Sequence, residues 1–185
     1  MRVILASKSP RRKELLKEIF QDFIIIPSTV DENKYSLDKL SFVKAEEISN
    51  LYPSDLVISA DTLVYLDNKI LGKPIDEKDA FKMLKSLSNK THVVTTYYSI
   101  FLKEQNIFFT NKSDSYVTFN ELSDELINNY IKTGSPLDKA GAYGIQDKEF
   151  NLVKEYTGEL NNIIGLPTYK LKQDLINLGI ILKDK

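Results

Sequence analysis

The sequence predicts an α/β fold built on a mixed sheet. Segments with helical spacing of apolar residues alternate with short β-branched or aromatic runs, at the intervals of a compact domain. One long run at residues 91–102 is closely followed by a second at 107–119, which we expect to return antiparallel to it. Strands linked through helices favour parallel pairing, so a long hairpin among them implies a mixed sheet.

The first half of the chain carries its strand and helix signals in alternation. Residues 2–6 form an apolar run typical of a buried strand. Ser9 and Pro10 then mark the start of a helix, because serine caps helices and proline fits their first turn. The further elements expected here are a strand at 23–26, a helix at about 37–51, a strand at 55–60 that ends at Asp61-Thr62, and a hairpin turn at Asp67-Asn68.

The second half begins with a helix that starts at Asp76 and carries its apolar residues on one face. The two long strands follow it. The remaining expectations are a short helix from Ser123 to about Lys132 closed by Gly134 and Pro136, a glycine-containing segment at 139–146, a strand at 150–156, a helix at 167–178 that Gly179 stops, and a last short strand at 180–182.

Composition and charge narrow the function classes. The 185 residues carry 25 Lys and Arg against 26 Asp and Glu, a net charge of −1, so there is no basic surplus for a nucleic acid polymer. Cysteine is absent, which removes disulfides, thiolate nucleophiles and sulfur-ligated metals. No signal peptide is recognisable, and no apolar run is long enough to cross a bilayer. We expect a cytoplasmic protein that binds neither a membrane nor a nucleic acid polymer.

Three cations surround the expected start of the first helix. Lys8, Arg11 and Arg12 stand where the helix dipole already places positive charge, which costs stability. Backbone N–H groups, the hydroxyls of Ser7 and Ser9, and the arginine side chains together describe a phosphate site. The alternative is solvated surface charge, with Ser9 as an ordinary N-cap.

Asp61 follows an apolar run and is expected at the carboxyl end of an inner strand, the edge where open α/β sheets bind ligands. A carboxylate there can hold a divalent metal or take a proton from water, and Thr62 adds a hydroxyl. Alternatively, Asp61 ends its strand and caps the next turn. Asp31 and Glu32 would suit a hard cation such as Mg²⁺ or Mn²⁺ jointly with Asp61, or they belong to a solvated loop.

Two lysines and a glutamine are further candidates. Lys44, on an expected helix, and Lys73 would each neutralise phosphate charge, although a solvated lysine is the ordinary alternative. His92 is the only histidine, which excludes a histidine-rich metal site, and we expect it to anchor its strand. The Gln146 amide would read a base edge through its acceptor and donors. The alternative for its segment is a tight turn that needs two glycines.

A series of short motifs runs in a fixed order over nearly the whole chain. The motifs are Leu5-Ala6-Ser7-Lys8-Ser9-Pro10-Arg11-Arg12, Asp31-Glu32, Lys44-Ala45, Asp61-Thr62, Gly72-Lys73-Pro74, His92-Val93-Val94-Thr95, Asp138-Lys139-Ala140-Gly141 and Gly165-Leu166-Pro167. In content and order they resemble the motifs of the Maf family of nucleotide pyrophosphatases. A series of this length is far more specific than any one of its members.

The resemblance implies an inosine-triphosphatase-like fold. This is an elongated mixed β-sheet flanked by helices, with two lobes and a cleft between them, in a single domain over residues 1–185. It also implies that water attacks the α-phosphate of a nucleoside triphosphate and releases pyrophosphate and the monophosphate. A divalent cation, Mg²⁺ or Mn²⁺, is the implied cofactor. The family often forms homodimers, so a homodimer is one expected state of this chain.

The same resemblance assigns roles to single residues. Asp61 takes the family position of proton acceptor. Arg11, Thr62 and Gln146 match the positions that select the base, and their combination is similar to the subgroup acting on dTTP and UTP rather than on 7-methyl-GTP. The other implied site residues are Ser7, Arg12, Lys44 and Lys73 for the triphosphate, and Glu32, together with Asp61, for the metal.

Departures from the family pattern are few, and two other functions stay open. Lys8 and Asp147 stand where glycine is common, and residues 159–161 replace a Ser/Tyr-containing stretch. One alternative function is a purine-type pyrophosphatase like the inosine triphosphatase group, against which the base-selecting residues argue. The other is a non-enzymatic regulator of septum formation that acts through a protein partner. Metal-dependent release of pyrophosphate by the purified protein distinguishes enzyme from regulator.

Overall fold

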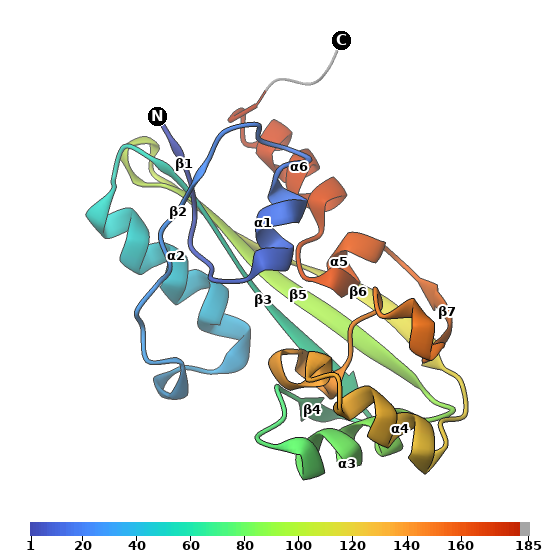
Figure 1. Cartoon of the computed structure of the whole chain (residues 1–185). Coiled ribbons are helices and arrows are strands. Elements are labelled where there is room, and N and C mark those ends of the chain that lie inside the picture. The colour runs from blue at the N-terminus through green and yellow to red at the C-terminus, as the bar shows by residue number, and fades with distance from the viewer. Residues whose placement is uncertain (182–185) are drawn as a thin grey trace. The chain divides into compact units, whose positions relative to one another are not determined.

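A seven-stranded mixed sheet organises the chain, in a computed structural model that describes residues 1–181. The strand order is β2-β1-β3-β5-β6-β7, with β4 paired to β3 (Figure 1). Pairing is parallel between β1 and both β2 and β3, and antiparallel in the β3–β4 and β6–β7 pairs. The strands are β1 (Val3–Leu5), β2 (Ile24–Ile25), β3 (Leu56–Leu66), β4 (Lys69–Leu71), β5 (Thr91–Leu102), β6 (Ile107–Phe119) and β7 (Val153–Thr157).

Six α-helices accompany these strands in the described part of the chain, so the mixed α/β fold expected from the sequence is confirmed. They are α1 (Pro10–Leu16), α2 (Leu40–Leu51), α3 (Glu77–Leu87), α4 (Asp124–Ile131), α5 (Leu160–Ile164) and α6 (Thr168–Asn177). The neighbouring strands β5 and β6 are joined through the short 3-10 helix η3 (Lys103–Gln105), a connection that only an antiparallel pair can use. None of the helices within residues 1–181 combines the length and apolar character needed to span a membrane.

The chain divides into two compact units. Unit 1 contains Met1–Asp61, Thr96–Ser113 and the segment that begins at Gly165. Unit 2 contains Thr62–Thr95 and Asp114–Ile164. The strands β3, β5 and β6 therefore contribute residues to both units.

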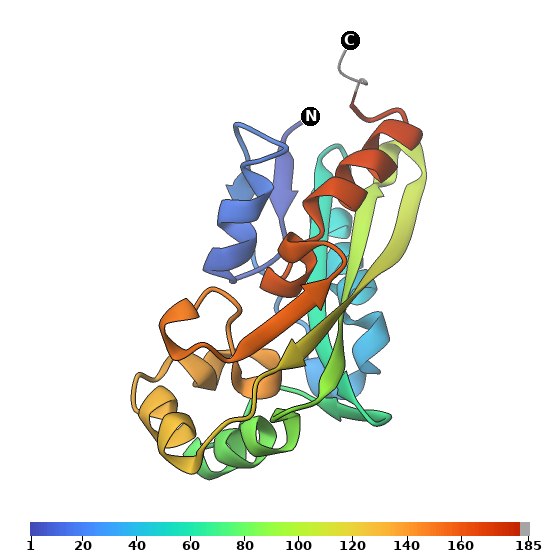
Figure 2. The same ribbon diagram turned by 90° about the vertical axis from the view of Figure 1, so that its right-hand side faces the viewer.

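In unit 1, helices cover both faces of the strands. Ala45 and Ile48 of α2 pack against a buried cluster that includes Phe101 of β5. The hydroxyl of Tyr98, also on β5, donates a hydrogen bond of 2.5 Å to Asp174 of α6. Side chains alternate along a strand, so Tyr98 and Phe101 point to opposite faces. Helices α2 and α6 therefore lie on opposite sides of β5 (Figure 2).

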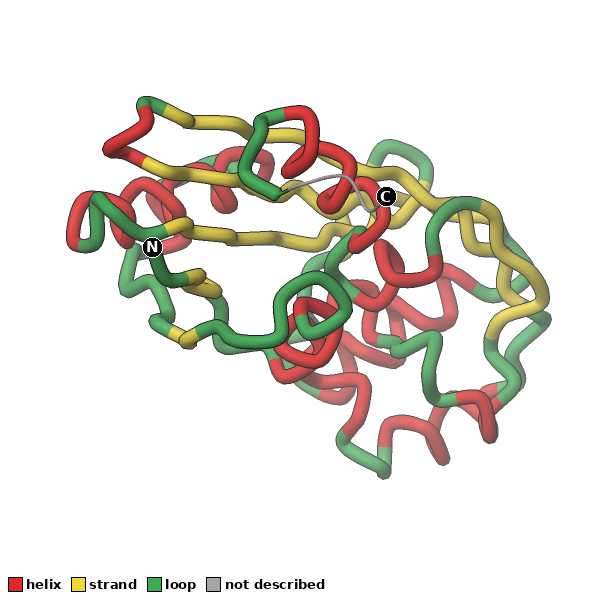
Figure 3. Tube along the Cα trace, turned by 90° about the horizontal axis from the view of Figure 1, so that it is seen from above, coloured by secondary structure: helices red, strands yellow, loops and turns green. Residues whose placement is uncertain are grey.

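In unit 2, α3 and α4 pack together on a larger apolar cluster. Each begins at an N-cap whose side chain accepts a backbone N–H bond, Asp76 for α3 and Ser123 for α4, as the sequence predicts. Between α4 and β7 the chain forms only loops and the 3-10 helices η4 (Ser135–Asp138), η5 (Ala140–Ala142) and η6 (Lys148–Phe150) (Figure 3). Packing and side-chain hydrogen bonds, rather than a backbone ladder, must hold this segment.

Two sequence-based expectations about strands are wrong. Strand β3 does not end at Asp61 but continues to Leu66, and its last residues pair with β4 across the expected turn at Asp67-Asn68. A charge is tolerated inside this strand because Lys44 neutralises it. Within the described residues, Ile180 and Ile181 form no strand, since their N–H groups bond back to the carbonyl of Leu175 at the end of α6. Leu182, the end of that expected strand, lies outside the described residues.

His92 is buried on β5 and anchors the strand, as expected. Its Nε2 lies 2.7 Å from the hydroxyl of Tyr143, and its ring packs edge-on against Phe119 and Tyr143. Burial lowers the pKa of His92 to about 4. An apolar pocket disfavours the charged imidazolium. Between pH 4 and pH 6.5 the native state therefore keeps this ring neutral, whereas the unfolded chain protonates it.

We predict that His92 makes the protein less stable in mild acid. Between pH 6.5 and pH 4 the unfolded state binds a proton that the folded state does not, so the free energy of unfolding falls as the pH falls through this window. The loss is about 2 to 3 kcal/mol. Urea denaturation at pH 7 and pH 4.5 measures it. In His92→Gln, which does not titrate, the difference between the two pH values should shrink by that amount; an unchanged difference contradicts the prediction.

Candidate active site

The first part of the site is the loop that follows β1. Ala6, the residue after β1, still donates its N–H to the carbonyl of Ile58 of β3. The chain then turns so that Ser9 caps α1, accepting the N–H of Arg12 at 3.4 Å. The hydroxyl of Ser7 accepts the N–H of Ser9 at 3.2 Å. Serine side chains thus shape this loop, and Ser9 is the N-cap that one interpretation of the sequence predicts.

Arg12 ties this loop to a distant part of unit 1. Its Nε donates to the carbonyl of Gly165 at 2.8 Å, and its guanidinium also donates to the Ser7 hydroxyl at 3.3 Å. Burial lowers the pKa of Arg12, while the nearby carboxylates of Asp61 and Glu32 act in the opposite direction. Arg12 is therefore not a solvated surface cation. The expected cost of positive charge at this helix start is offset, in the case of Arg12, by these hydrogen bonds.

Asp61 and Glu32 meet at Lys44. The Lys44 ammonium lies 2.9 and 3.0 Å from the two carboxylate oxygens of Asp61 and 2.7 Å from Glu32. The Lys44 and Asp61 side chains are only 12% and 15% exposed, whereas Glu32 is 58% exposed. Because both side chains are largely buried, water screens the attraction between Lys44 and Asp61 only weakly. This ion pair therefore restrains both side chains more than a surface ion pair would. The structure thus brings together three residues predicted from separate sequence segments.

The position of Asp61 follows from the parallel part of the sheet. The residues of β3 that pair with β1 are Leu56, Val57 and Ile58, and Asp61 lies three residues further on. The loop that carries Ser7 leaves the same end of β1. Although β3 itself continues, Asp61 stands just beyond the carboxyl end of its parallel pairing, which is where open α/β sheets bind ligands.

The donor set at Asp61 and Glu32 is suitable for a hard cation. Carboxylate oxygens are the ligands that Mg²⁺ and Mn²⁺ prefer, and both groups already approach one positive centre, the Lys44 ammonium. Within residues 1–181, no group of three or more His, Cys, Asp or Glu side chains is arranged to hold a metal. Two carboxylates match a cation that keeps several waters, as Mg²⁺ does, better than a closed protein cage.

The remaining candidates belong to different surroundings. Arg11 is half-buried at the start of α1 in unit 1. In unit 2, Thr62 is half-buried on β3, and Lys73 is exposed in a bend after β4. Gln146 is exposed in a turn, and its backbone carbonyl accepts the N–H of Lys148 at 2.9 Å. The alternative interpretation of that segment, a tight turn that needs two glycines, is supported at Gly141, which has a φ of 69° and packs against Val64.

Sequence reasoning missed two anchoring groups. The Glu47 carboxylate on α2 accepts hydrogen bonds from Ser28 and Thr29, which fixes the loop leading to Glu32. Near Gln146, the Asp147 carboxylate accepts hydrogen bonds from Tyr130 and Ser135. No local sequence pattern predicts that a carboxylate will accept a hydrogen bond from a residue 12 to 19 positions away. The unusual Asp147 beside Gln146 was the one available signal.

Comparisons with known proteins agree with this arrangement of motifs. The family described as Maf-like protein matches residues 2–178. A dTTP/UTP pyrophosphatase of Thermosipho africanus is 48% identical, over 98% of this chain and 95% of its own length. Proteins with the same description from Clostridium beijerinckii and Acholeplasma laidlawii are 45% and 41% identical, over 93% and 99% of this chain and 96% and 100% of their own. The chain therefore belongs to the Maf family.

Proposed function

We propose that this protein is a nucleoside triphosphate pyrophosphatase that hydrolyses dTTP and UTP to the monophosphate and pyrophosphate. The observation that carries the proposal is the convergence of Asp61 and Glu32 on Lys44, with Arg12 close enough to both carboxylates for their charge to act on it. This arrangement unites a base, cation ligands and anion-binding groups. The description shared by its nearly full-length relatives supports the choice of substrates.

Asp61 is the proposed general base. Each of its oxygens has two lone pairs and Lys44 occupies one direction on each, so the carboxylate keeps capacity to accept a proton from water. Lys44 meanwhile holds the carboxylate in one orientation, and positioning of this kind is a large part of general-base catalysis. The attack of that water on the α-phosphate releases pyrophosphate.

Glu32 and Asp61 would hold the divalent cation, Mg²⁺ or Mn²⁺, which would polarise phosphate oxygens and offset their charge. The proposed triphosphate ligands are Ser7, Arg12, Lys44 and Lys73. The proposed base-selecting residues are Arg11, Thr62 and Gln146. We further propose that residues 1–185 act as a single Maf-like domain in the cytoplasm, with a homodimer as one assembly state.

Asp61→Asn should abolish most activity without unfolding the protein. The amide is nearly isosteric but has neither the negative charge nor the basicity of the carboxylate, so kcat should fall on the order of 10²- to 10⁴-fold. Pyrophosphate release from dTTP with saturating Mg²⁺ measures this. Asp67→Asn is the matched control, because that residue sits in an exposed turn at a φ of 48°, which asparagine tolerates. Turnover by Asp61→Asn at the rate of the control would remove Asp61 from the base role.

Arg12→Ala should reduce both stability and triphosphate use. It deletes the bonds to Gly165 and Ser7, which should lower the free energy of unfolding by about 1 to 3 kcal/mol, and it should raise the KM for dTTP. Chemical denaturation and steady-state kinetics give the two values. Lys8→Ala, which removes an exposed cation from the same loop, should leave stability unchanged. A fully active but destabilised Arg12→Ala would restrict Arg12 to a structural role.

The base preference should be for uracil and thymine. These bases share one hydrogen-bonding edge and differ by a methyl group, which contributes no more than about 1 to 3 kcal/mol to discrimination, so UTP and dTTP should both be substrates. CTP carries an amino group in place of a carbonyl and should react markedly more slowly.

Gln146→Glu should lower activity on UTP and dTTP more than any residual activity on purines, because an ionised carboxylate cannot donate a hydrogen bond. The assay is pyrophosphate release from UTP, dTTP, CTP, GTP and 7-methyl-GTP, with Gln105→Glu at an exposed position as the control. Preference of the wild type for 7-methyl-GTP, or an unaltered profile in Gln146→Glu, would contradict the assignment.

A further inference from the structure

A buried tyrosine closes the turn that carries Gln146. Tyr130 on α4 is fully buried, and its hydroxyl donates to the Asp147 carboxylate at 2.5 Å while accepting the N–H of Gly144 at 2.9 Å. Within the turn, the N–H of Asp147 bonds to the carbonyl of Gly144 at 3.1 Å. One hydroxyl therefore connects the two residues that bracket Ile145 and Gln146. We call the side chains of Tyr130, Asp147 and Ser135 the turn clamp.

A second donor completes the clamp. The Ser135 hydroxyl donates to the same Asp147 oxygen at 2.7 Å, and the Lys139 ammonium donates to Ser135 at its carbonyl and its hydroxyl, at 2.6 and 3.0 Å. The Asp147 carboxylate is thus fixed by two hydroxyls from η4 and α4. Burial of Tyr130 and its hydrogen bond to the Asp147 carboxylate raise the pKa of the tyrosine above its ordinary value, so the donor proton stays on the tyrosine.

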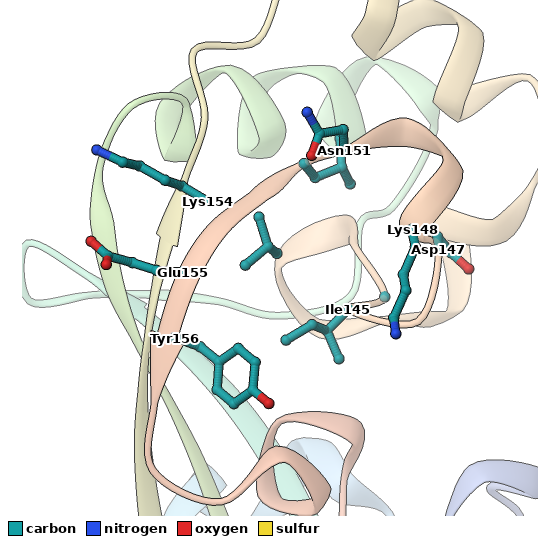
Figure 4. Close-up of a pocket in the computed structure, with 10 residues that line it drawn as sticks. Ile145, Asp147, Lys148, Asn151, Lys154, Glu155 and Tyr156 are labelled. Atoms are coloured by element: carbon teal, nitrogen blue, oxygen red, sulfur yellow. The ribbon is translucent and has the colours of Figure 1, made fainter.

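The backbone of the turn is also closely packed. A Cβ atom at Gly144 would lie 2.9 Å from Lys139 Cε and 3.1 Å from the Asp147 carboxylate, so glycine allows this close approach. The same turn forms one wall of a cavity of about 520 Å³ in unit 2. Figure 4 shows Ile145 of the turn and Tyr156 of β7 pointing toward one another across this cavity, with Asp147 and Lys148 on the side of the turn. Gln146 is exposed between two residues that line this cavity.

We propose that the turn clamp fixes the backbone from which the Gln146 amide reaches a base, which makes Asp147 a positioning residue for base selection. The inference rests on the proposed function, since it gives Gln146 a base to read. An exposed glutamine has several rotatable bonds, so a fixed backbone limits the positions from which its one acceptor and two donors can meet a base edge. Removing the clamp should leave the chemistry at Asp61 unchanged but reduce the preference for UTP over CTP.

The test compares Asp147→Ala with Asp147→Asn, Tyr130→Phe and the control Glu149→Ala, which alters an exposed acidic residue of η6. For each purified protein, kcat and KM are measured with UTP and CTP. In Asp147→Ala we expect the ratio of kcat/KM for UTP over CTP to fall about tenfold, chiefly through a higher KM for UTP. Asp147→Asn keeps an oxygen acceptor and should restore part of the ratio. Tyr130→Phe removes only a hydroxyl and tests the clamp even if Asp147→Ala fails to fold.

The outcomes separate the inference from the function on which it rests. An unchanged UTP to CTP ratio in Asp147→Ala and Tyr130→Phe would overturn the positioning role while leaving the pyrophosphatase intact. An equal loss for all nucleotides together with a lower Tm would mean that the clamp is only structural. A wild type that releases pyrophosphate without preferring UTP would end the base-reading role of Gln146 and this inference with it. A wild type without pyrophosphatase activity would overturn the proposed function itself.

Discussion

The contact between Lys44 and two carboxylates is the constraint on which the candidate active site depends. Two carboxylates near one another repel, and moving Asp61 away from water adds a desolvation cost. The Lys44 ammonium lies 2.7 to 3.0 Å from oxygens of both carboxylates and offsets these costs. It also connects three segments, namely α2, β3 and the segment before α2 that contains Glu32. The same geometry allows a carboxylate inside β3, where a charge without a partner would be excluded.

Neighbouring contacts extend this constraint over unit 1. Glu47, one turn along α2 from Lys44, holds the loop that leads to Glu32, and Arg12 connects the loop after β1 to Gly165. Each of these charged groups therefore stabilises the fold and also shapes the surroundings of Asp61. Unit 2 relies on a different kind of bond. There, the hydroxyls of two buried tyrosines make the anchoring hydrogen bonds. Tyr143 bonds to His92, and Tyr130 bonds to Asp147 and Gly144.

These two kinds of interaction respond differently to conditions. Charged contacts around Lys44 are sensitive to the arrival of an anionic substrate or a cation, because added charge changes the balance directly. The hydrogen bonds of the buried tyrosines are shielded from solvent, so they change little with salt, and their geometry is set by packing. A chain that binds triphosphate through charges and selects a base through an amide would need both properties, one for each task.

The amino-acid sequence was enough to predict most of the helices and strands and the family to which the chain belongs. Apolar periodicity, N-caps such as Asp76 and Ser123, and the Asp67-Asn68 turn depend on local interactions, so they could be predicted from neighbouring residues. The ordered motifs predicted the Maf family and the candidate residues. Long-range packing instead places Asp61 inside a longer strand and turns Ile180 and Ile181 back onto the end of α6. It also gives anchoring roles to four charged side chains, those of Lys44, Glu47, Arg12 and Asp147. These depend on partners up to 153 residues away, and periodicity contains no information about which distant side chain meets which.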